Sequence, residues 1–350
     1  MSVSNLLIKY KNKLLTIPVL VILVLAVLIT PAFTNAQEQG GSGLSISPTR
    51  TELSMLPGTS DVVTVSLKNI TSGPIIAKIF VNDFEPDNET GEPKTVVDPE
   101  KRSASSISGF LSELEDVPLE SGESKDVSVN VTIPENAAPG GYYGALRFQA
   151  VPVGADTGST QGSEVSLTAN LLSLVLIEVP GDIEQKVIID SVRAYLDTKA
   201  GSIFTKKPNF VGIRIENEGN SFVKPFGRVA VRNLQGNEVF SYELNDSNPR
   251  SNVLPNSGRT FKDRLMNVIT QNVNGADTTV ETSPITTPGR YTITADISYG
   301  NGGEVFTVKS NFWYLPVWFI VSVLAVVTAL IVLGIYLYKK YATKSTKKRR

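Results

Sequence analysis

Five carboxylates gather in residues 83–92, and oxygen ligands of this kind could bind a calcium ion. The candidate ligands are Asp83, Glu85, Asp87 and Glu89, and a turn is expected at Gly91. Their spacing does not match the twelve-residue loop of helix–loop–helix calcium sites. Polar residues around a glycine are also typical of a solvated hairpin tip. The sequence therefore predicts a hairpin tip without a metal, and a calcium site is the alternative.

Ser221 and Lys224 have the Ser-x-x-Lys spacing of acyl-serine enzymes. That chemistry needs a helix to bring both side chains to one face, but Pro225 follows directly and strand patterns flank the motif. The chain has no cysteine and no histidine, which excludes thiolate nucleophiles, imidazole bases and the usual zinc ligand sets. We therefore expect a hairpin edge here, no enzyme and no cofactor. Hydrolysis by paired carboxylates is the catalytic alternative that this composition leaves.

The stretch PGGYYGALRF, residues 139–148, could be a phosphate-binding loop, a platform for stacking sugars, or a turn into a strand. A phosphate loop is excluded because neither a helix pattern nor the Lys-Ser/Thr ending follows. Pro139–Gly140 recurs as Pro288–Gly289, and in both places an alternating strand pattern opens with tyrosine. Proline fixes φ at the first turn position and glycine supplies the positive φ of the next. These residues therefore predict a turn into a strand.

The tyrosines after these turns, Tyr142 or Tyr143 and then Tyr291, resemble the corner tyrosine of immunoglobulin-like sandwiches. The hydroxyl of a corner tyrosine bonds to nearby backbone. Only one of the two tyrosines after the first turn can be the corner tyrosine. The other either packs in the ordinary way or is exposed and contacts a partner. Tyr142 and Tyr143 are therefore the candidate binding residues.

The elements that position these residues are strands, because apolar and polar residues alternate at period two through the middle of the chain. The pattern appears in VVTVSLKN (62–69), DVSVNVTI (126–133) and YTITADISY (291–299), and residues 105–115 suggest only a short helical turn or an irregular crossing. The order of strand and turn signals also repeats between the two halves. The sequence predicts an all-β chain of two tandem immunoglobulin-like antiparallel β-sandwich domains.

Both ends of the chain are apolar and flanked by basic residues. Residues 1–36 have a basic start, an apolar run and a small-residue ending, which predicts a secretory signal peptide, with an uncleaved anchor as the alternative. Residues 312–338 are uncharged, long enough to cross a bilayer as a helix, and carry tryptophan or tyrosine at both ends. The tail, 339–350, is basic and has no acidic residue. This asymmetry predicts a single-pass membrane protein with an extracellular N-terminal region and a cytoplasmic tail.

Residues 37–43 form a glycine-rich spacer, 44–180 the first domain and 183–311 the second. All 34 acidic residues lie between the leader and the tail, whereas ten of the 33 basic residues lie in those two segments. An exported region this acidic excludes nucleic-acid binding. Residues 151–164 have the composition of a flexible loop, and the apolar run 165–179 predicts a last strand buried on both faces. The two-residue linker, 181–182, favours a semi-rigid rod.

Several segments together resemble the WxL-interacting protein family of Gram-positive cell surfaces. They are ISPTRTELSMLPGTSDVVTVSLKNIT, NDFEPDNETGEP, TIPENAAPGGYYGALRF, NVLPNSGRTFKDRL and PGRYTITADISYGNG, followed by the membrane segment and the basic tail. The resemblance covers residues 44–350 in order. It implies a first domain that binds peptidoglycan and a second domain that binds host or partner proteins, beside WxL surface proteins.

The sequence thus predicts a non-catalytic, membrane-anchored surface protein that binds cell-wall peptidoglycan, surface proteins or both. Recognition through loops or strand edges fits such a protein, because edge addition uses backbone groups and needs no pocket. The alternative is an extracytoplasmic chaperone or scaffold for a secreted or pilus-like subunit, since such chaperones share the sandwich fold.

Overall fold

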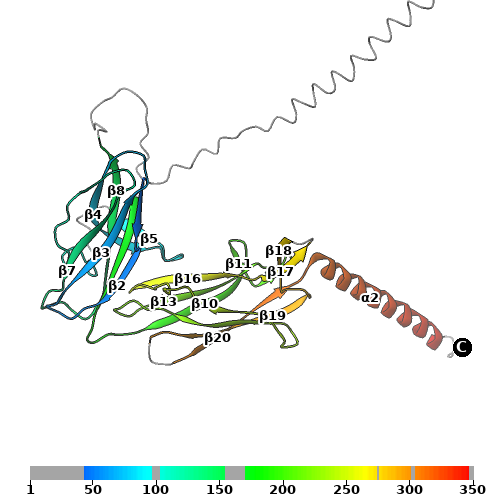
Figure 1. Ribbon diagram of the computed structural model, residues 1–350. Coiled ribbons are helices and arrows are strands. Elements are labelled where there is room, and N and C mark those ends of the chain that lie inside the picture. The colour runs from blue at the N-terminus through cyan, green and yellow to red at the C-terminus, as the bar shows by residue number, and fades with distance from the viewer. Residues whose placement is uncertain (1–42, 97–102, 154–169, 274–275, 301–303, 347–350) are drawn as a thin grey trace, which may run out of the picture.

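A computed structural model describes residues 43–96, 103–153, 170–273, 276–300 and 304–346. The chain is mostly β, with two sandwiches followed by one C-terminal helix (Figure 1). This confirms the predicted fold class. The predicted signal peptide, most of the spacer and most of the 151–164 loop lie outside the described residues.

The first sandwich packs a three-stranded sheet against a larger one. The order in the smaller sheet is β1 (Leu44–Ser47), β3 (Ser60–Asn69) and β7 (Ser124–Thr132). The order in the larger sheet is β2 (Arg50–Ser54), β9 (Asn170–Val179), β8 (Gly140–Pro152), β4 (Ile75–Pro86) and β5 (Pro93–Val96), and β6 (Val117–Leu119) also pairs with β4. Alternate residues, such as Val63, Val65 and Leu67, fill the core between the sheets.

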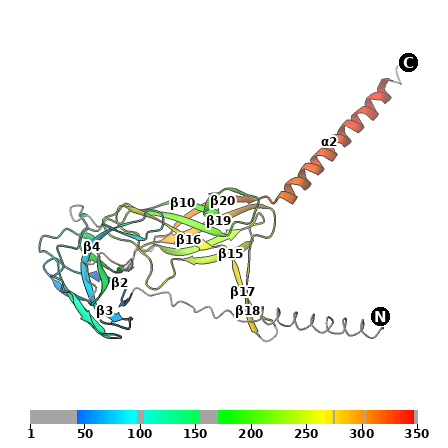
Figure 2. The same ribbon diagram turned by 90° about the horizontal axis from the view of Figure 1, so that it is seen from above.

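The second sandwich has its own core and a similar pair of sheets. One sheet has the order β11 (Lys199–Gly201), β10 (Val187–Leu196), β13 (Phe210–Asn217) and β16 (Ser257–Arg264). The other has the order β12 (Ile203–Phe204), β20 (Phe306–Tyr314), β19 (Gly289–Ser298), β14 (Phe226–Arg232) and β15 (Glu238–Leu244). A separate hairpin, β17 (Asn267–Val273) and β18 (Ala276–Thr282), stands off the sandwich (Figure 2).

The two sandwiches have matching topologies. In each, the last strand pairs antiparallel with the strand before it, β9 with β8 and β20 with β19. In each, a strand from the start of the domain pairs parallel with that last strand, β2 with β9 and β12 with β20. The repeated order of sequence signals is therefore a repeat of one module.

A buried asparagine holds the turn after β3 in the first module and after β13 in the second. The Asn69 side-chain amide donates to the carbonyls of Gly73, Leu119 and Glu120 at 2.8, 3.2 and 3.0 Å. The Asn217 amide likewise donates to the carbonyls of Ser221 and Val253 at 2.8 and 3.0 Å. Because buried polar groups need partners, these bonds explain why asparagine recurs in both turns.

The two domains meet at a bend (Figure 1), in contrast to the rod that the short linker favours. A third apolar cluster lies between them, with Phe84, Tyr143, Ala145 and Leu176 of the first domain around Leu254 of the second. The second domain therefore covers the part of the larger sheet's outer face that carries Phe84, Tyr143 and Leu176. Leu176 lies in this cluster while Val175 and Ile177 face the first core, which confirms that β9 is buried on both faces.

The C-terminal helix α2 (Val317–Thr346) begins later than predicted. Residues 312–314 belong to β20, where Phe312 pairs with Tyr291 and is buried in the second core. Pro316 follows the strand, and its carbonyl accepts the N–H groups of Phe319 and Ile320 at 2.9 and 3.2 Å. Proline at a helix start fixes φ where no N–H is needed, so the helix begins there. The segment Val317–Lys340 is long and apolar enough to cross a membrane.

Candidate functional site

The corner tyrosines lie where the sequence places them. Tyr142 donates its hydroxyl to the Ala138 carbonyl at 3.0 Å, and Tyr291 donates to the Thr287 carbonyl at 2.7 Å. The preceding glycines, Gly140 and Gly289, have φ of 149° and 145°, which a residue with a Cβ rarely adopts. Pro139 and Pro288 precede them, so both turns are structural.

Tyr143 is not an exposed binding residue. Its side chain is 8% exposed and packs on Phe84, with 5.2 Å between ring centroids, in the cluster between the domains. Gly141 beside it donates its N–H to the Asn220 carbonyl of the second domain at 2.8 Å. A Cβ at Gly141 would lie 3.2 Å from Ser221 and Phe222, so glycine is needed for this close approach. PGGYY is thus both a turn and part of the domain interface.

The four candidate calcium ligands point to different partners. Asp83, 9% exposed, accepts from the hydroxyl of Ser106 and the backbone N–H of Ser103, and Glu85 is exposed. Asp87 forms an ion pair with Lys94 at 2.5 Å, which holds the pKa of its carboxyl well below its usual range. In the described part of the chain, no group of acidic residues converges as a metal site would need.

The tip of this β4–β5 hairpin is docked, whereas the sequence predicts a solvated tip. The Asn88 carbonyl accepts from Arg214 at 2.7 Å, and the Glu89 carbonyl accepts from the Thr260 N–H at 2.8 Å. The Glu89 carboxylate also lies 3.4 Å from Arg214. The hairpin therefore joins the first domain to β13 and β16 of the second.

Ser221 and Lys224 also belong to the domain interface, in a loop where the sequence predicts a hairpin edge. Ser221 donates to the Glu178 carboxylate at 2.7 Å, while Lys224 binds the Glu52 carboxylate, so neither side chain activates the other. Burial alone would raise the pKa of Glu52, but hydrogen bonds from Lys224 and Asn252 and the charges of Lys224 and Arg50 outweigh it. The pKa of Glu52 is lowered, and its carboxylate stays ionised in the interface.

A different feature, the open edge of the second sandwich, can bind a partner. Strand β20 pairs with β19 along its length, but on its other side β12 pairs only with Trp313 and Tyr314. Trp313 donates its N–H to the Ser202 carbonyl on that side at 2.7 Å. Because backbone groups alternate along a strand, those of Thr307, Lys309 and Asn311 point to the same side. Among the described strands, none pairs with this edge from Phe306 to Asn311.

The facing strand, β10, is also open. It pairs with β13 along its length, but on its other side β11 pairs only with Ala194, Tyr195 and Leu196. Strands β10 and β20 therefore border the same side of the sandwich, and each has an edge that is unpaired over most of its length. We call this side the β10–β20 groove.

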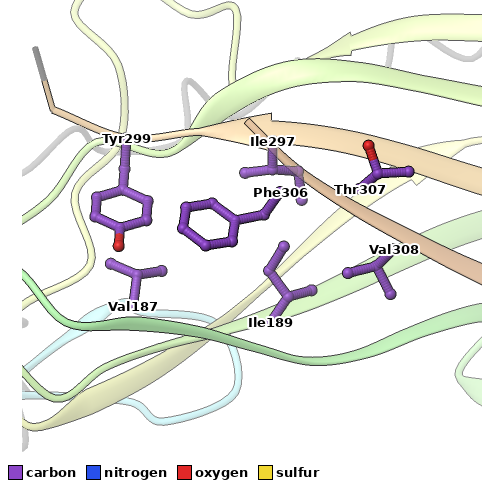
Figure 3. Close-up of a pocket in the computed structure, with 7 residues that line it drawn as sticks. All are labelled: Val187, Ile189, Ile297, Tyr299, Phe306, Thr307 and Val308. Atoms are coloured by element: carbon purple, nitrogen blue, oxygen red, sulfur yellow. The ribbon is translucent and has the colours of Figure 1, made fainter. Parts of the chain in front are cut away.

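An apolar cavity of about 180 Å³ lies in the groove (Figure 3). Its lining residues are Val187, Ile189, Ile297, Tyr299, Phe306, Thr307 and Val308. Tyr299 and Phe306 stack with 5.5 Å between centroids, and Phe306 is 36% exposed although it lies on the core-facing side of β20. Apolar side chains of a partner could complete this incomplete part of the core.

A second cavity, of about 350 Å³, continues the groove toward α2. Arg193, Ser202 and Asn311 are among its lining residues, so it is more polar than the first. Arg193 and Lys309 are both exposed on the two strands that border the groove. These cations favour a partner segment that carries acidic residues beside its apolar ones.

Sequence reasoning missed the groove because β20 has the alternation of an ordinary half-buried strand. Phe306 and Val308 alternate with Thr307 and Lys309, and nothing in this pattern shows that the neighbouring strand is absent. The brevity of β12 was the available signal, since Gly201 and Pro208 leave little room for a longer strand.

No protein-family model matches the chain, and no curated protein matches its sequence. Among solved structures, the class 5 fimbriae chaperone CfaA shares 16% identity over 78% of this chain and 100% of that chain, with a TM-score of 0.36. The CsuC–CsuE chaperone–tip subunit complex of Acinetobacter baumannii shares 13% identity over 76% of this chain and 97% of that chain, with a TM-score of 0.34. The CupB2 chaperone of Pseudomonas aeruginosa shares 11% identity over 77% of this chain and 100% of that chain, with a TM-score of 0.34. At these values, what this chain binds has to be argued from its own geometry.

Proposed function

We propose that the chain is a non-catalytic, membrane-anchored surface protein that binds an extended segment of a partner protein in the β10–β20 groove. The observation that carries this proposal is the unpaired edge of β20 beside an apolar cavity. An added strand would satisfy the backbone groups of Thr307, Lys309 and Asn311 and place alternate side chains into the cavity.

The dimensions of the groove define the partner segment. The open part of β20, from Phe306 to Asn311, is about 20 Å long at ~3.3 Å per residue. A strand of that length would place two or three apolar side chains toward Ile189 and Val308 and expose the residues between them. The partner is therefore a short amphipathic strand, with acidic residues that match Arg193 and Lys309.

Helix α2 is the proposed anchor, because it follows β20 directly and is long and apolar enough to span a bilayer. The basic residues after it would hold the tail in the cytoplasm and the two sandwiches outside. The peptidoglycan binding implied by the resemblance is a separate expectation for the first domain. Pelleting of the full chain with protein-free cell walls tests that expectation.

Cross-linking in intact cells tests strand addition. A photoreactive residue at Thr307, on the open edge, should capture one protein, whereas the same residue at Lys68 should not. Lys68 is also exposed, but its strand is paired on both sides. Lys309→Pro and Lys309→Ala both remove the cation, but only Lys309→Pro also removes an edge N–H, so capture should fall much further in Lys309→Pro than in Lys309→Ala. Equal capture in both variants would refute strand addition.

The second candidate function is a chaperone or scaffold for a secreted subunit, and the same groove favours it. The residues of the second core all come from this chain, so a segment added at the β20 edge would not be part of that core and could leave again. Pulse labelling separates the two functions. A chaperone would cross-link only to newly made subunits and lose them during the chase, whereas a stable surface complex would keep its partner.

A further inference from the structure

An exposed patch lies on the second sandwich at the end where α2 begins. Arg290 of β19, Trp313 of β20 and Ile203 of β12 are directly in register across three neighbouring strands. Residues in register point to the same face of a sheet. Trp313 is 42% exposed, Ile203 is 65% exposed and Arg290 is also exposed. A tryptophan and an isoleucine thus lie beside a cation on the outer face of the sheet.

The chain holds this patch close to the start of the helix. Strand β20 ends at Tyr314 and α2 begins at Val317, so only Leu315 and Pro316 join them. Leu315 donates its N–H to the Phe204 carbonyl at 2.8 Å, which fixes β12 against the connection. Trp313 is therefore no more than about 14 Å along the chain from the first residue of the helix, at ~3.5 Å per residue.

Two further cations follow in the same segment. Lys206 and Lys207 come directly after β12 and are exposed. The region between the leader and the tail is acidic as a whole, so the segment 199–207, with three lysines and no acidic residue, is a local reversal of charge. Basic side chains suit anionic headgroups, and tryptophan favours the interface between headgroups and acyl chains.

We propose that this patch, formed by Ile203, Lys206, Lys207, Arg290 and Trp313, rests on the headgroups of an anionic bilayer. This inference rests on the proposed anchoring by α2 but not on strand addition in the groove. The contact orients the second domain relative to the membrane. It also places the polar end of the β10–β20 groove, at Ser202 and Asn311, near the lipid surface.

Tryptophan fluorescence tests the contact, because Trp313 and Trp318 are the two tryptophans of the chain. The full chain with Trp318→Phe is reconstituted in phosphatidylcholine vesicles with and without phosphatidylglycerol, some of them brominated near the headgroup. We expect Trp313 emission to shift to the blue and to be quenched by the brominated lipid when phosphatidylglycerol is present. Lys206→Gln, Lys207→Gln and Arg290→Gln together should remove most of that shift and quenching.

Two controls give each outcome a meaning. Lys68→Gln, Lys78→Gln and Lys125→Gln remove the same charge from the first domain and should leave Trp313 quenching unchanged. The variant Trp313→Phe leaves Trp318, which reports whether α2 is in the bilayer. Quenching of Trp318 but not Trp313 overturns the headgroup contact alone. A lack of quenching at both positions overturns the anchoring and this inference with it.

Discussion

The two sandwiches share a topology but differ at the exposed side of their last strand. In the first domain, β2 pairs with β9 from Leu174 to Glu178 and covers half of its edge. In the second domain, β12 covers only the last two residues of β20. The first module is therefore more closed on this side than the second, which has the β10–β20 groove.

The difference arises from where the first strand changes sheets. In the first domain the chain leaves the smaller sheet after Ser47 and begins β2 at Arg50. In the second domain it stays with β13 from Val187 to Tyr195 and reaches the other sheet only at Ile203. The same fold thus has a more covered or a more open edge on its last strand, depending on how soon the start of the domain passes from one sheet to the other. The proposed function depends on this local difference and not on the fold as a whole.

The largest expected effect comes from proline at the more covered edge. Met55 donates its N–H to the Glu178 carbonyl, and by alternation Leu53 also points its N–H toward β9. Leu53→Pro should therefore remove a ladder hydrogen bond and destabilise the first domain by about 3 kcal/mol. Lys309→Pro on the open edge should change the stability of the second domain by less than about 0.5 kcal/mol. Hydrogen exchange of β9 and β20 in urea measures both, and equal losses would remove the distinction between the edges.

Filling the groove should affect binding more than folding. Ile189→Trp places a larger apolar side chain into the cavity beside Val308 and Phe306. Because the cavity is open at the side, we expect little loss of thermal stability. Capture of the partner at Thr307 should fall about tenfold, which corresponds to about 1.4 kcal/mol. Leu53→Val in the first domain is the matched control, and reduced capture in that variant would show a general defect.

The corner tyrosines provide a smaller test of the two modules. The Tyr291 hydroxyl is well buried, bonds to the Thr287 carbonyl and also accepts from its N–H at 3.2 Å. Tyr291→Phe should cost about 1 kcal/mol of unfolding free energy in the second domain. Tyr142→Phe should cost about 0.5 kcal/mol in the first, because its site is more exposed and water can replace the bond. A reversed order in urea unfolding would contradict this assignment.

Acid should loosen the contact between the modules, and this is the smallest effect. The pKa of Glu52 is lowered from its ordinary value of 4.5, so its stabilising contribution is complete above that value and is lost as the pH falls through the lowered pKa. Fluorescent labels at Thr64→Cys and Lys199→Cys can follow the domain distance, since the chain has no other cysteine. Glu52→Gln should flatten the change below about pH 4.5. An unaltered acid response in that variant would rule out Glu52 as its source.

Local features could be predicted from the sequence. The strands follow from period-two alternation, and the turns follow from Pro-Gly before Tyr142 and Tyr291. These depend on neighbours in the chain, so a short stretch of residues determines them. The late start of α2 was missed because Phe312 is as apolar as a membrane residue, yet it packs against Tyr291 at 5.3 Å between ring centroids.

Features that depend on distant segments could not be predicted. Tyr143 points away from the first core and lies in the cluster between the domains, where Leu254 of the second domain helps to bury it. The acid-rich tip has the composition of a solvated turn. Its backbone carbonyls nevertheless accept hydrogen bonds from Arg214 and Thr260, which are more than a hundred residues away in the sequence. The open edge of β20 likewise results from the path of β10 and β12. In each case the residues that make the contact are far apart in the sequence, so a local sequence pattern does not reveal it.

The direct connection between β20 and α2 also determines how the molecule bears mechanical force. Tension between the membrane and a bound partner would enter the second domain at Tyr314 and run along β20. The bonds from β20 to β19 lie across that direction, so they would be loaded together in shear and not broken one at a time. A partner strand added to β20 would share the same geometry. The strand that borders the groove is thus also the one through which a chain anchored by α2 would resist being pulled from a membrane.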